Sequence, residues 1–226
     1  MRQTQVYLVS PHIDDAVFSL GAYLTIMRKH YQLLVINLFS QTNFAYESII
    51  STKEATSILK CEDKEILELI GVEHIYYADL PNALLRGYTL HNIFTERDSY
   101  SWHDKHIFQE IKIFIESLVQ PESILFIPSG FGSHIDHLLA RDACENLNAT
   151  KIYYSDLPYA SSDINYANTN ANLFLINKKK EKIYIHKEDI DLHIDLCRAY
   201  KSQFLNRFVQ EMSSYLINNH YTVWKN

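Results

Sequence analysis

Short apolar runs, rich in β-branched side chains, alternate along this chain with segments whose apolar residues recur every three or four positions. The runs are typical of strands buried on both faces of a sheet, and the recurrence is typical of amphipathic helices. The expected strands are Gln5–Ser10, Leu33–Phe39, Ile75–Tyr77, Ser123–Pro128 and Ile152–Tyr154. This alternation favours an α/β fold with a largely parallel sheet, and we expect residues 1–226 to form a single domain.

Helices are expected between these strands. The apolar residues from Val17 to Met27 are spaced by 3, 4 and 3 positions, so they share one face of a helix. The same pattern predicts helices within Ala55–Ile70, Ile107–Leu118, Ile135–Leu147 and Ile190–Phe208. Gly71 is placed to end the helix that precedes it, because glycine readily adopts the left-handed conformation found there.

Two other regions lack this pattern. Leu173–Asn177 and Lys182–His186 are expected to form a late hairpin with a solvated turn at Lys178–Lys180. Leu80–Trp102 has no clean period and is expected to be a long loop. The aromatic and charged stretch Phe94–His103 is interpreted either as a surface excursion packed on the core or as a loop that contacts a sugar substrate.

The composition argues against several classes of partner. The formal net charge is −6 and no stripe of basic residues occurs, so a nucleic-acid partner is not expected. No apolar run of about 18 residues occurs, so no integral membrane segment is expected. Cys61, Cys144 and Cys197 are far apart and are expected to be buried, reduced thiols, in keeping with a cytoplasmic location. The oligomeric state is left open.

Two polar segments occupy corresponding places in the pattern. Ser10–Asp15 reads SPHIDD and Ser133–His137 reads SHIDH, and each lies between an expected strand and an expected helix. All such turns lie at the carboxyl edge of a parallel sheet, where ligand sites form. We therefore expect the two segments, about 120 residues apart in sequence, to converge in space.

The side chains of these segments suit one open metal site. A catalytic zinc ion takes three nitrogen or oxygen ligands and keeps one position for water. His12 and Asp15 can reach one ion from a single turn, and His137 can supply the third ligand. The remaining polar side chains are Asp14, His134 and Asp136, which are then available for proton transfer.

Simpler interpretations exist for each segment taken alone. Asp14 or Asp15 can cap the helix that follows, and His134 or Asp136 can do the same for the later helix. The occurrence of both segments at matching turns favours a functional site. His103–His106 also has ligand-like spacing, but it follows no expected strand and is interpreted as the surface start of a helix.

The segments PHIDD and HIDH resemble the motif pair of the PIG-L/LmbE-like family of zinc-dependent N-acetylglucosaminyl deacetylases. Asp156–Ala160 and Tyr200–Gln203 resemble further elements of that family. The chain also departs from the family pattern, because Ala16 stands where many members have Glu. In addition, Lys60–Asp63 lacks the Arg that several branches carry in the comparable region, which bears on substrate contacts rather than on the metal.

The resemblance implies a Rossmann-like, three-layer α/β fold and a role for each residue of the site. It implies that His12, Asp15 and His137 bind Zn²⁺, that Asp14 is the general base, and that His134 stabilises the oxyanion or protonates the leaving amine, with Asp136 as its orienting partner. His/His/Asp sites also accept Fe²⁺, Co²⁺ or Mn²⁺.

The implied activity is hydrolysis of an N-acetyl or other N-acyl group on a small amino sugar or glycoconjugate. Precursors of thiols, antibiotics, glycolipids and polysaccharides are all compatible with the family. The alternatives are a metal-dependent phosphoesterase, which often needs two metal ions, and a non-catalytic sugar-binding relative. One metal ion per chain would favour the deacetylase over the phosphoesterase.

Overall fold

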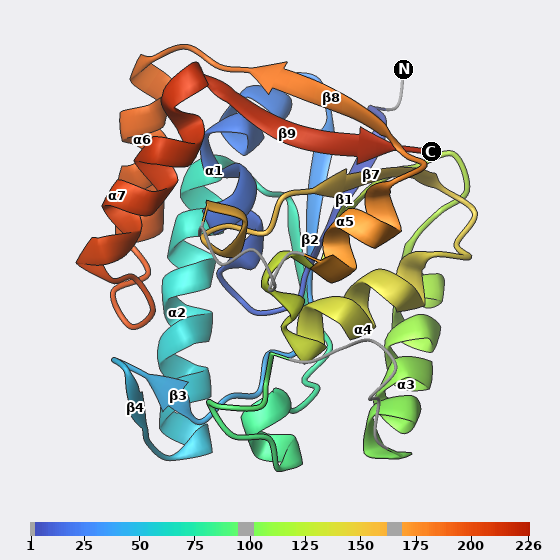
Figure 1. Ribbon diagram of the computed structural model, residues 1–226, viewed down its shortest axis with the longest axis vertical. Coiled ribbons are helices and arrows are strands. Elements are labelled where there is room, and N and C mark those ends of the chain that lie inside the picture. The colour runs from blue at the N-terminus through green and yellow to red at the C-terminus, as the bar shows by residue number, and fades with distance from the viewer. Residues whose placement is uncertain (1–2, 95–101, 162–168) are drawn as a thin grey trace.

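A seven-stranded sheet with the order β5-β2-β1-β6-β7-β9-β8 organises the fold (Figure 1). The computed structural model describes residues 3–94, 102–161 and 169–226, with the side chains of residues 102 and 103 left out. Its parallel strands are β1 (Gln5–Ser10), β2 (Gln32–Asn37), β5 (His74–Tyr77), β6 (Ile124–Pro128) and β7 (Thr150–Tyr154). The expected strands and the largely parallel sheet are therefore confirmed.

The sheet is completed by two strands that the sequence pattern did not reveal as a pair. β9 (His220–Lys225) runs antiparallel to β7, and β8 (Lys179–Tyr184) runs antiparallel to β9 at the edge of the sheet. The prediction that Leu173–Asn177 forms a strand paired with the next one was wrong, because most of these residues belong to helix α5 (Thr169–Leu175). Only Ala171 and Leu175 of that helix are buried, and their spacing of four matches one helical face.

Helices cover both faces of the sheet and give the three-layer arrangement (Figure 1). One layer contains α1 (Asp15–Met27), α2 (Thr52–Ile70), α6 (Glu188–Arg198) and α7 (Asn206–Tyr215), and the other contains α3 (Trp102–Leu118), α4 (Ile135–Cys144) and α5. Successive residues of a strand face opposite sides. Accordingly, Val6 and Leu8 of β1 pack in one apolar core, whereas Tyr7 and Val9 pack in the other.

The single long helix expected over Ile190–Phe208 is two helices. α6 ends at Arg198 and α7 begins at Asn206. Between them, the hydroxyl of Tyr200 donates to Asp63 and the hydroxyl of Ser202 donates to Glu62, both on α2. These bonds turn the chain toward α2, which a helical apolar pattern alone does not predict. Gly71 ends α2 in the left-handed conformation (φ 90°), as expected.

Short elements line the carboxyl edge of the sheet. They are the hairpin β3 (Phe44–Ala45) and β4 (Ser48–Ile49) and the 3₁₀ turns η1 (Ala83–Arg86), η3 (Phe131–Ser133), η4 (Tyr159–Ser161) and η6 (Leu216–Asn218). Cys144 and Cys197 are buried as expected, but Cys61 is exposed on the outer side of α2. Among the described residues, none of the helices is long and apolar enough to cross a membrane.

The strand order reverses direction between β1 and β6. From β1 the chain continues outward through β2 to β5, and from β6 it continues outward through β7, while β1 and β6 pair in parallel with each other. Loops that leave two neighbouring strands in opposite directions leave a crevice at their carboxyl ends, where ligands bind in open α/β sheets. The SPHIDD segment follows β1 and the SHIDH segment follows β6, so they flank this crevice.

The buried carboxylate of Asp63 joins α2 to the sheet and to the α6–α7 connection. It accepts hydrogen bonds from Asn37 Nδ2 at 2.8 Å and from the hydroxyls of Tyr77 and Tyr200, each at 2.7 Å. Burial outweighs these bonds and raises the pKa of Asp63 from 3.8 to about 7. The folded state therefore binds a proton that the unfolded chain releases at lower pH.

This raised pKa predicts a pH-dependent stability that Asp63→Asn removes. The contribution of the carboxyl is complete below pH 3.8 and is lost as the pH rises through about 7. The free energy of unfolding of the wild type should thus fall relative to that of Asp63→Asn across this interval, by roughly 2–4 kcal/mol at about 1.36 kcal/mol per pKa unit. Urea unfolding of both proteins over this pH range measures the difference. The exposed Asp195→Asn serves as the control, and an unchanged difference across the range would contradict the prediction.

Candidate metal centre and active site

The turn after β1 is closed by its own side chains. The Ser10 hydroxyl donates to the carbonyl of His12 and accepts from the amide of Ala16, while the amide of His12 donates to Asp15 Oδ2 at 2.7 Å. Asp14 stands at the N-cap of α1, yet its side chain makes no capping hydrogen bond. The carboxylate of Asp14 lines a cleft instead, so the capping alternative does not account for this residue.

The turn after β6 places three more side chains beside the first turn. Gly130 (φ 84°), Gly132 (φ 82°) and Ser133 (φ 57°) bend the chain sharply before α4. His134 is the N-cap of α4, and its Nδ1 accepts from the amide of Asp136 at 3.2 Å. His134 thus has a capping role, but this bond uses only one of its two ring nitrogens and leaves Nε2 for another partner.

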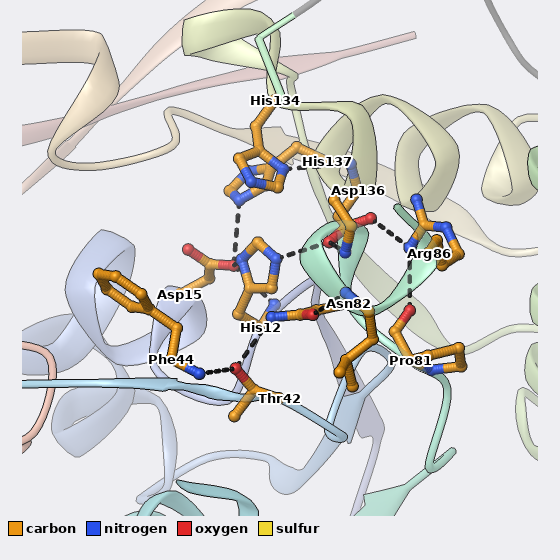
Figure 2. A network of polar contacts seen from close by, with 12 residues as sticks. His12, Asp15, Thr42, Phe44, Pro81, Asn82, Arg86, His134, Asp136 and His137 are labelled. Atoms are coloured by element: carbon orange, nitrogen blue, oxygen red, sulfur yellow. Dashed lines mark hydrogen bonds and ion pairs between the residues drawn. The ribbon is translucent and has the colours of Figure 1, made fainter. Parts of the chain in front are cut away.

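His12, Asp15 and His137 come together as a ligand set (Figure 2). Asp15 Oδ2 lies 3.1 Å from His12 Nδ1 and 3.2 Å from His137 Nε2. Ligands placed about 2.0–2.2 Å from a tetrahedral zinc ion are separated by about 3.3–3.6 Å, so these distances are close to those of a bound site. His137 Nε2 is buried and has no hydrogen-bond partner among the described residues. A divalent cation fits this nitrogen and its neighbours.

A second grouping, His12 with His134 and Asp136, overlaps the first. Its carboxylate is already engaged, because Asp136 Oδ2 accepts from His12 Nε2 at 2.9 Å and from the amide of Ala83 at 3.0 Å. Asp136 Oδ1 forms an ion pair with Arg86 Nη1 at 2.8 Å. Asp136 was expected to orient the ring of His134 with its carboxylate. The carboxylate instead contacts His12 and Arg86. The hydrogen bond from Asp136 to the His134 ring comes from its backbone amide.

The buried charges of the site shift one another's protonation. Burial lowers the pKa values of His12 and His137, but the charge of Asp15 and the bonds to neighbouring carboxylates raise them to about 9 and about 10. Burial raises the pKa of Asp15, but the two histidines hold it well below its usual range. With these pKa values both imidazoles carry an extra proton in the metal-free protein, and these protons lie on the ring nitrogens that face Asp15. A cation that binds the same nitrogens must displace them.

The two remaining proton-transfer candidates shift in opposite directions. Burial, followed by the charge of Asp15, raises the pKa of Asp14 from 3.8 to about 7. Burial, followed by the charge of His12, lowers the pKa of His134 well below 6.5. His134 is then neutral, and because its Nδ1 accepts a hydrogen bond, its proton is on Nε2.

The cleft beside these residues has a volume of about 570 Å³. Its lining combines apolar and polar side chains. The apolar ones include Phe18, Phe39, Phe44, Leu59, Leu84, Leu90, Ile93, Leu205 and Phe208, and the polar ones beyond the histidine and aspartate cluster include Thr42, Glu47, Asn82, Gln203, Arg207 and Glu211. Phe94 packs edge-on against His134 and Tyr159, with ring centroids 5.6 Å and 5.8 Å apart, and remains 46% exposed. A cleft lined mainly by apolar and aromatic side chains together with polar groups is typical of small-molecule sites.

Two residues of this network were given no role from the sequence: Asp156, noted only as part of the family-like segment Asp156–Ala160, and Arg86, which was not singled out at all. Asp156 follows β7 at the same sheet edge, and its Oδ1 bonds His137 Nδ1 at 2.7 Å, so the strand-end argument could have found it. Arg86 lies in the aperiodic stretch after β5, where no local pattern marks it. His103–His106 does start a helix, α3, as expected. Residues 95–101 lie outside the described residues, and they include most of the stretch Phe94–His103, whose interpretation as a surface excursion or as a substrate-contacting loop was left open.

Fold and site together define an α/β protein with a candidate metal centre at the carboxyl edge of its sheet. The sequence profile of the PIG-L family, described as GlcNAc-PI de-N-acetylase, matches residues 7–148. The chain belongs to this family, as the motif resemblance indicated. The match contains all six residues of the predicted site, whereas Asp156 follows it.

Individual relatives agree with this assignment. The 2′-N-acetylparomamine deacetylase of Streptomyces fradiae is 26% identical over 174 residues, which are 71% of this chain and 59% of that protein. The chain thus spans less than two thirds of the length of this relative.

Solved structures share the fold. A deacetylase–BOG complex from the teicoplanin biosynthesis pathway has a TM-score of 0.75 at 19% identity, covering 98% of this chain and 97% of the other. The zinc-inhibited form of teicoplanin deacetylase has a TM-score of 0.73 at 17% identity, with the same coverage. N,N′-diacetylchitobiose deacetylase from Pyrococcus horikoshii has a TM-score of 0.57 at 17% identity, covering 97% of this chain and 81% of the other.

Proposed function

We propose that this protein is a zinc-dependent de-N-acetylase that removes an N-acetyl or other N-acyl group from an amino sugar or sugar conjugate. The observation that carries the proposal is the buried Nε2 of His137, which has no hydrogen-bond partner among the described residues and lies 3.2 Å from Asp15 Oδ2, beside a cleft lined by His12, Asp14, Asp15 and His134. Two imidazoles and one carboxylate suit Zn²⁺, and Fe²⁺ is the second candidate. The relatives named as deacetylases of amino-sugar compounds support the substrate class.

The roles of the side chains follow from their environments. A bound divalent ion would supply a Lewis acid for the amide carbonyl and would activate water. Asp14, free of any capping bond and with a pKa near 7, accepts the proton of the attacking water. His134, neutral with its proton on Nε2, donates a hydrogen bond to the developing oxyanion. Because His134 resists protonation, Asp14 is the better donor of a proton to the departing amine.

Release of free amine from a panel of N-acylated amino sugars tests the proposal. The panel should include N-acetyl monosaccharides, an N-acetylated disaccharide and an aminoglycoside, with the zinc-loaded protein and Asp14→Asn assayed side by side. We expect amine release by the wild type only. Metal content measured on the same samples should be one ion per chain, because both ligand groupings among the described residues share His12. Two ions per chain with phosphate-ester hydrolysis would favour a phosphoesterase, and bound metal without turnover of any compound would favour a sugar-binding protein.

Phe94→Ala is expected to raise KM without loss of metal. The exposed ring of Phe94 beside His134 can pack against the apolar face of a sugar, and its removal should raise KM roughly fivefold to tenfold, the equivalent of about 1 kcal/mol of apolar contact. Steady-state kinetics with the best panel substrate provides the measurement. Tyr184→Ala, which removes an exposed aromatic ring outside the cleft, is the matched control. Equal KM values for Phe94→Ala and wild type would assign this ring to the protein surface only.

A further inference from the structure

Each histidine of the ligand set has a carboxylate on its second nitrogen. His137 Nδ1 bonds Asp156 at 2.7 Å, which leaves Nε2 toward Asp15, and His12 Nε2 bonds Asp136 at 2.9 Å, which leaves Nδ1 toward Asp15. A carboxylate that accepts the proton of one ring nitrogen fixes the tautomer and the ring orientation, so the other nitrogen presents its lone pair to a metal ion.

The second oxygen of the carboxylate behind His137 is held by backbone amides within the described part of the chain. Asp156 Oδ2 accepts from the amides of Ser129, Gly130 and Phe131 at 3.0, 2.9 and 3.0 Å. These three consecutive donors belong to the bend between β6 and η3. The donors are main-chain groups, so they do not depend on the side chains of Ser129 and Phe131.

The carboxylate behind His12 is held in a different way. The turn η1 contacts Asp136 from both of its ends, with the Ala83 amide on Oδ2 at 3.0 Å and Arg86 Nη1 at 2.8 Å from Oδ1. Apart from this ion pair, Asp136 Oδ1 has no hydrogen-bond partner among the described residues. One half of the carboxylate therefore depends on a single side chain.

Arg86 is itself fixed on the side away from the cleft. Its side chain is 3% exposed and is not part of the cleft wall. Nη1 also donates to the carbonyl of Pro81 at 2.9 Å, while Nε and Nη2 donate to Asp104 Oδ1 on α3 at 3.3 and 3.2 Å. Figure 2 shows Arg86 behind Asp136, with His12 on the opposite side of the carboxylate. Arg86 contacts two neighbours of His12: the carboxylate of Asp136 and the ring of Phe39, whose centroid lies 4.9 Å from the guanidinium carbon and 6.3 Å from the centroid of the His12 ring. Of these two, Asp136 is the one that bonds a ring nitrogen of His12.

We propose that Arg86 is a positioning residue of the metal centre: it holds Asp136 against Nε2 of His12, so that His12 presents Nδ1 to the ion. The inference rests on the proposed metal site but not on the deacetylase reaction. The planar guanidinium is suited to this task, because its N–H groups donate to Asp104 and to the carbonyl of Pro81 while the same group forms the ion pair with Asp136, which a lysine ammonium cannot reproduce.

The test is the affinity for Zn²⁺ alone, measured by competition with a chromophoric chelator. Arg86→Gln should bind Zn²⁺ about 10- to 100-fold more weakly than the wild type, the usual effect of losing a group behind a metal ligand. Arg198→Gln is the control, since Arg198 also forms an ion pair with a carboxylate, Asp195 at 3.2 Å, but both side chains are exposed on α6. Its affinity should stay near the wild-type value, and equal losses in both variants would overturn the proposal.

A double-mutant cycle separates positioning from a general structural effect. Asp136→Asn should weaken Zn²⁺ binding as well, and Arg86→Gln should add little in that background, because Arg86 acts through Asp136. Additive losses would mean that Arg86 reaches the site by another route and would overturn the inference. A protein that binds Zn²⁺ in this pattern but releases no amine from any sugar would refute the proposed function and leave the role of Arg86 intact.

The ring nitrogens of His12 provide a readout that does not depend on any variant folding. In the ¹⁵N spectrum of the zinc-loaded wild type, Nε2 of His12 should carry a slowly exchanging proton and Nδ1 should show the shift of a metal-bound nitrogen. Zinc on Nε2 would overturn the proposal. In Arg86→Gln, where it folds, exchange of the Nε2 proton should be faster.

Discussion

Asp14→Asn is expected to keep its metal ion and to lose about 10²- to 10⁴-fold in kcat, the usual contribution of a general base. Asn has nearly the same shape as Asp but cannot accept a proton from water. The Asp14 side chain makes no capping bond, so its replacement should leave α1 and the ligand set undisturbed. Metal analysis and steady-state kinetics on the same preparation measure the two effects separately.

Asp142→Asn is the matched control for this substitution. Asp142 is also a buried carboxylate, but it pairs with Arg141 outside the cleft, so its replacement should leave kcat near the wild-type value. Near-normal kcat in Asp14→Asn would remove Asp14 from the catalytic role, and loss of metal in that variant would instead place Asp14 among the ligands.

His137→Ala should abolish binding of the metal ion and, with it, turnover. The substitution removes a ligand atom and also leaves Asp15 and Asp156 without their shared cationic neighbour. The fold should survive, because alanine is compatible with helix α4 and the apolar residues of the two cores stay unchanged. The wild type should gain thermal stability when Zn²⁺ is added, since a ligand that binds only the folded state stabilises it, whereas His137→Ala should show no such gain.

The control for His137→Ala is another buried histidine. His193 lies between α1 and β9 and accepts or donates a bond with the Tyr221 hydroxyl at 3.0 Å, remote from the ligand set. His193→Ala should keep its metal ion and its zinc-dependent gain in stability. If His137→Ala retained a full equivalent of metal, the ligand set would have to be the overlapping one of His12, His134 and Asp136.

The six candidate residues could be placed from sequence because the argument needed only two facts. Each segment follows a strand whose apolar run is unmistakable, and parallel strands bring their carboxyl ends to one edge. His12 and His137 are thus neighbours in space although 125 positions separate them. The helices were found for a similar reason, since the apolar faces of α1, α2, α3 and α4 repeat over several turns.

What the sequence could not supply depends on contacts between distant segments. Arg86 carries no periodic or motif signal, and its importance arises only because β5 delivers η1 to the back of Asp136. The break between α6 and α7 depends in the same way on bonds that Tyr200 and Ser202 make to α2. α5 was mistaken for a strand because Leu173–Ile176 is a continuous apolar run, although Leu173 and Ile176 are exposed.

The cleft is lined by the proposed reacting groups and by residues from other segments of the chain. The proposed reacting groups belong to the turns after β1 and β6, whereas other lining residues come from Pro158, Tyr159 and the 203–211 segment, which includes the start of α7. For an enzyme built in this way, the reaction and the choice of substrate can diverge independently. Exchange of the 203–211 segment between relatives would then redirect the catalyst to a new sugar without redesign of its chemistry, which makes this short stretch the natural target for engineering.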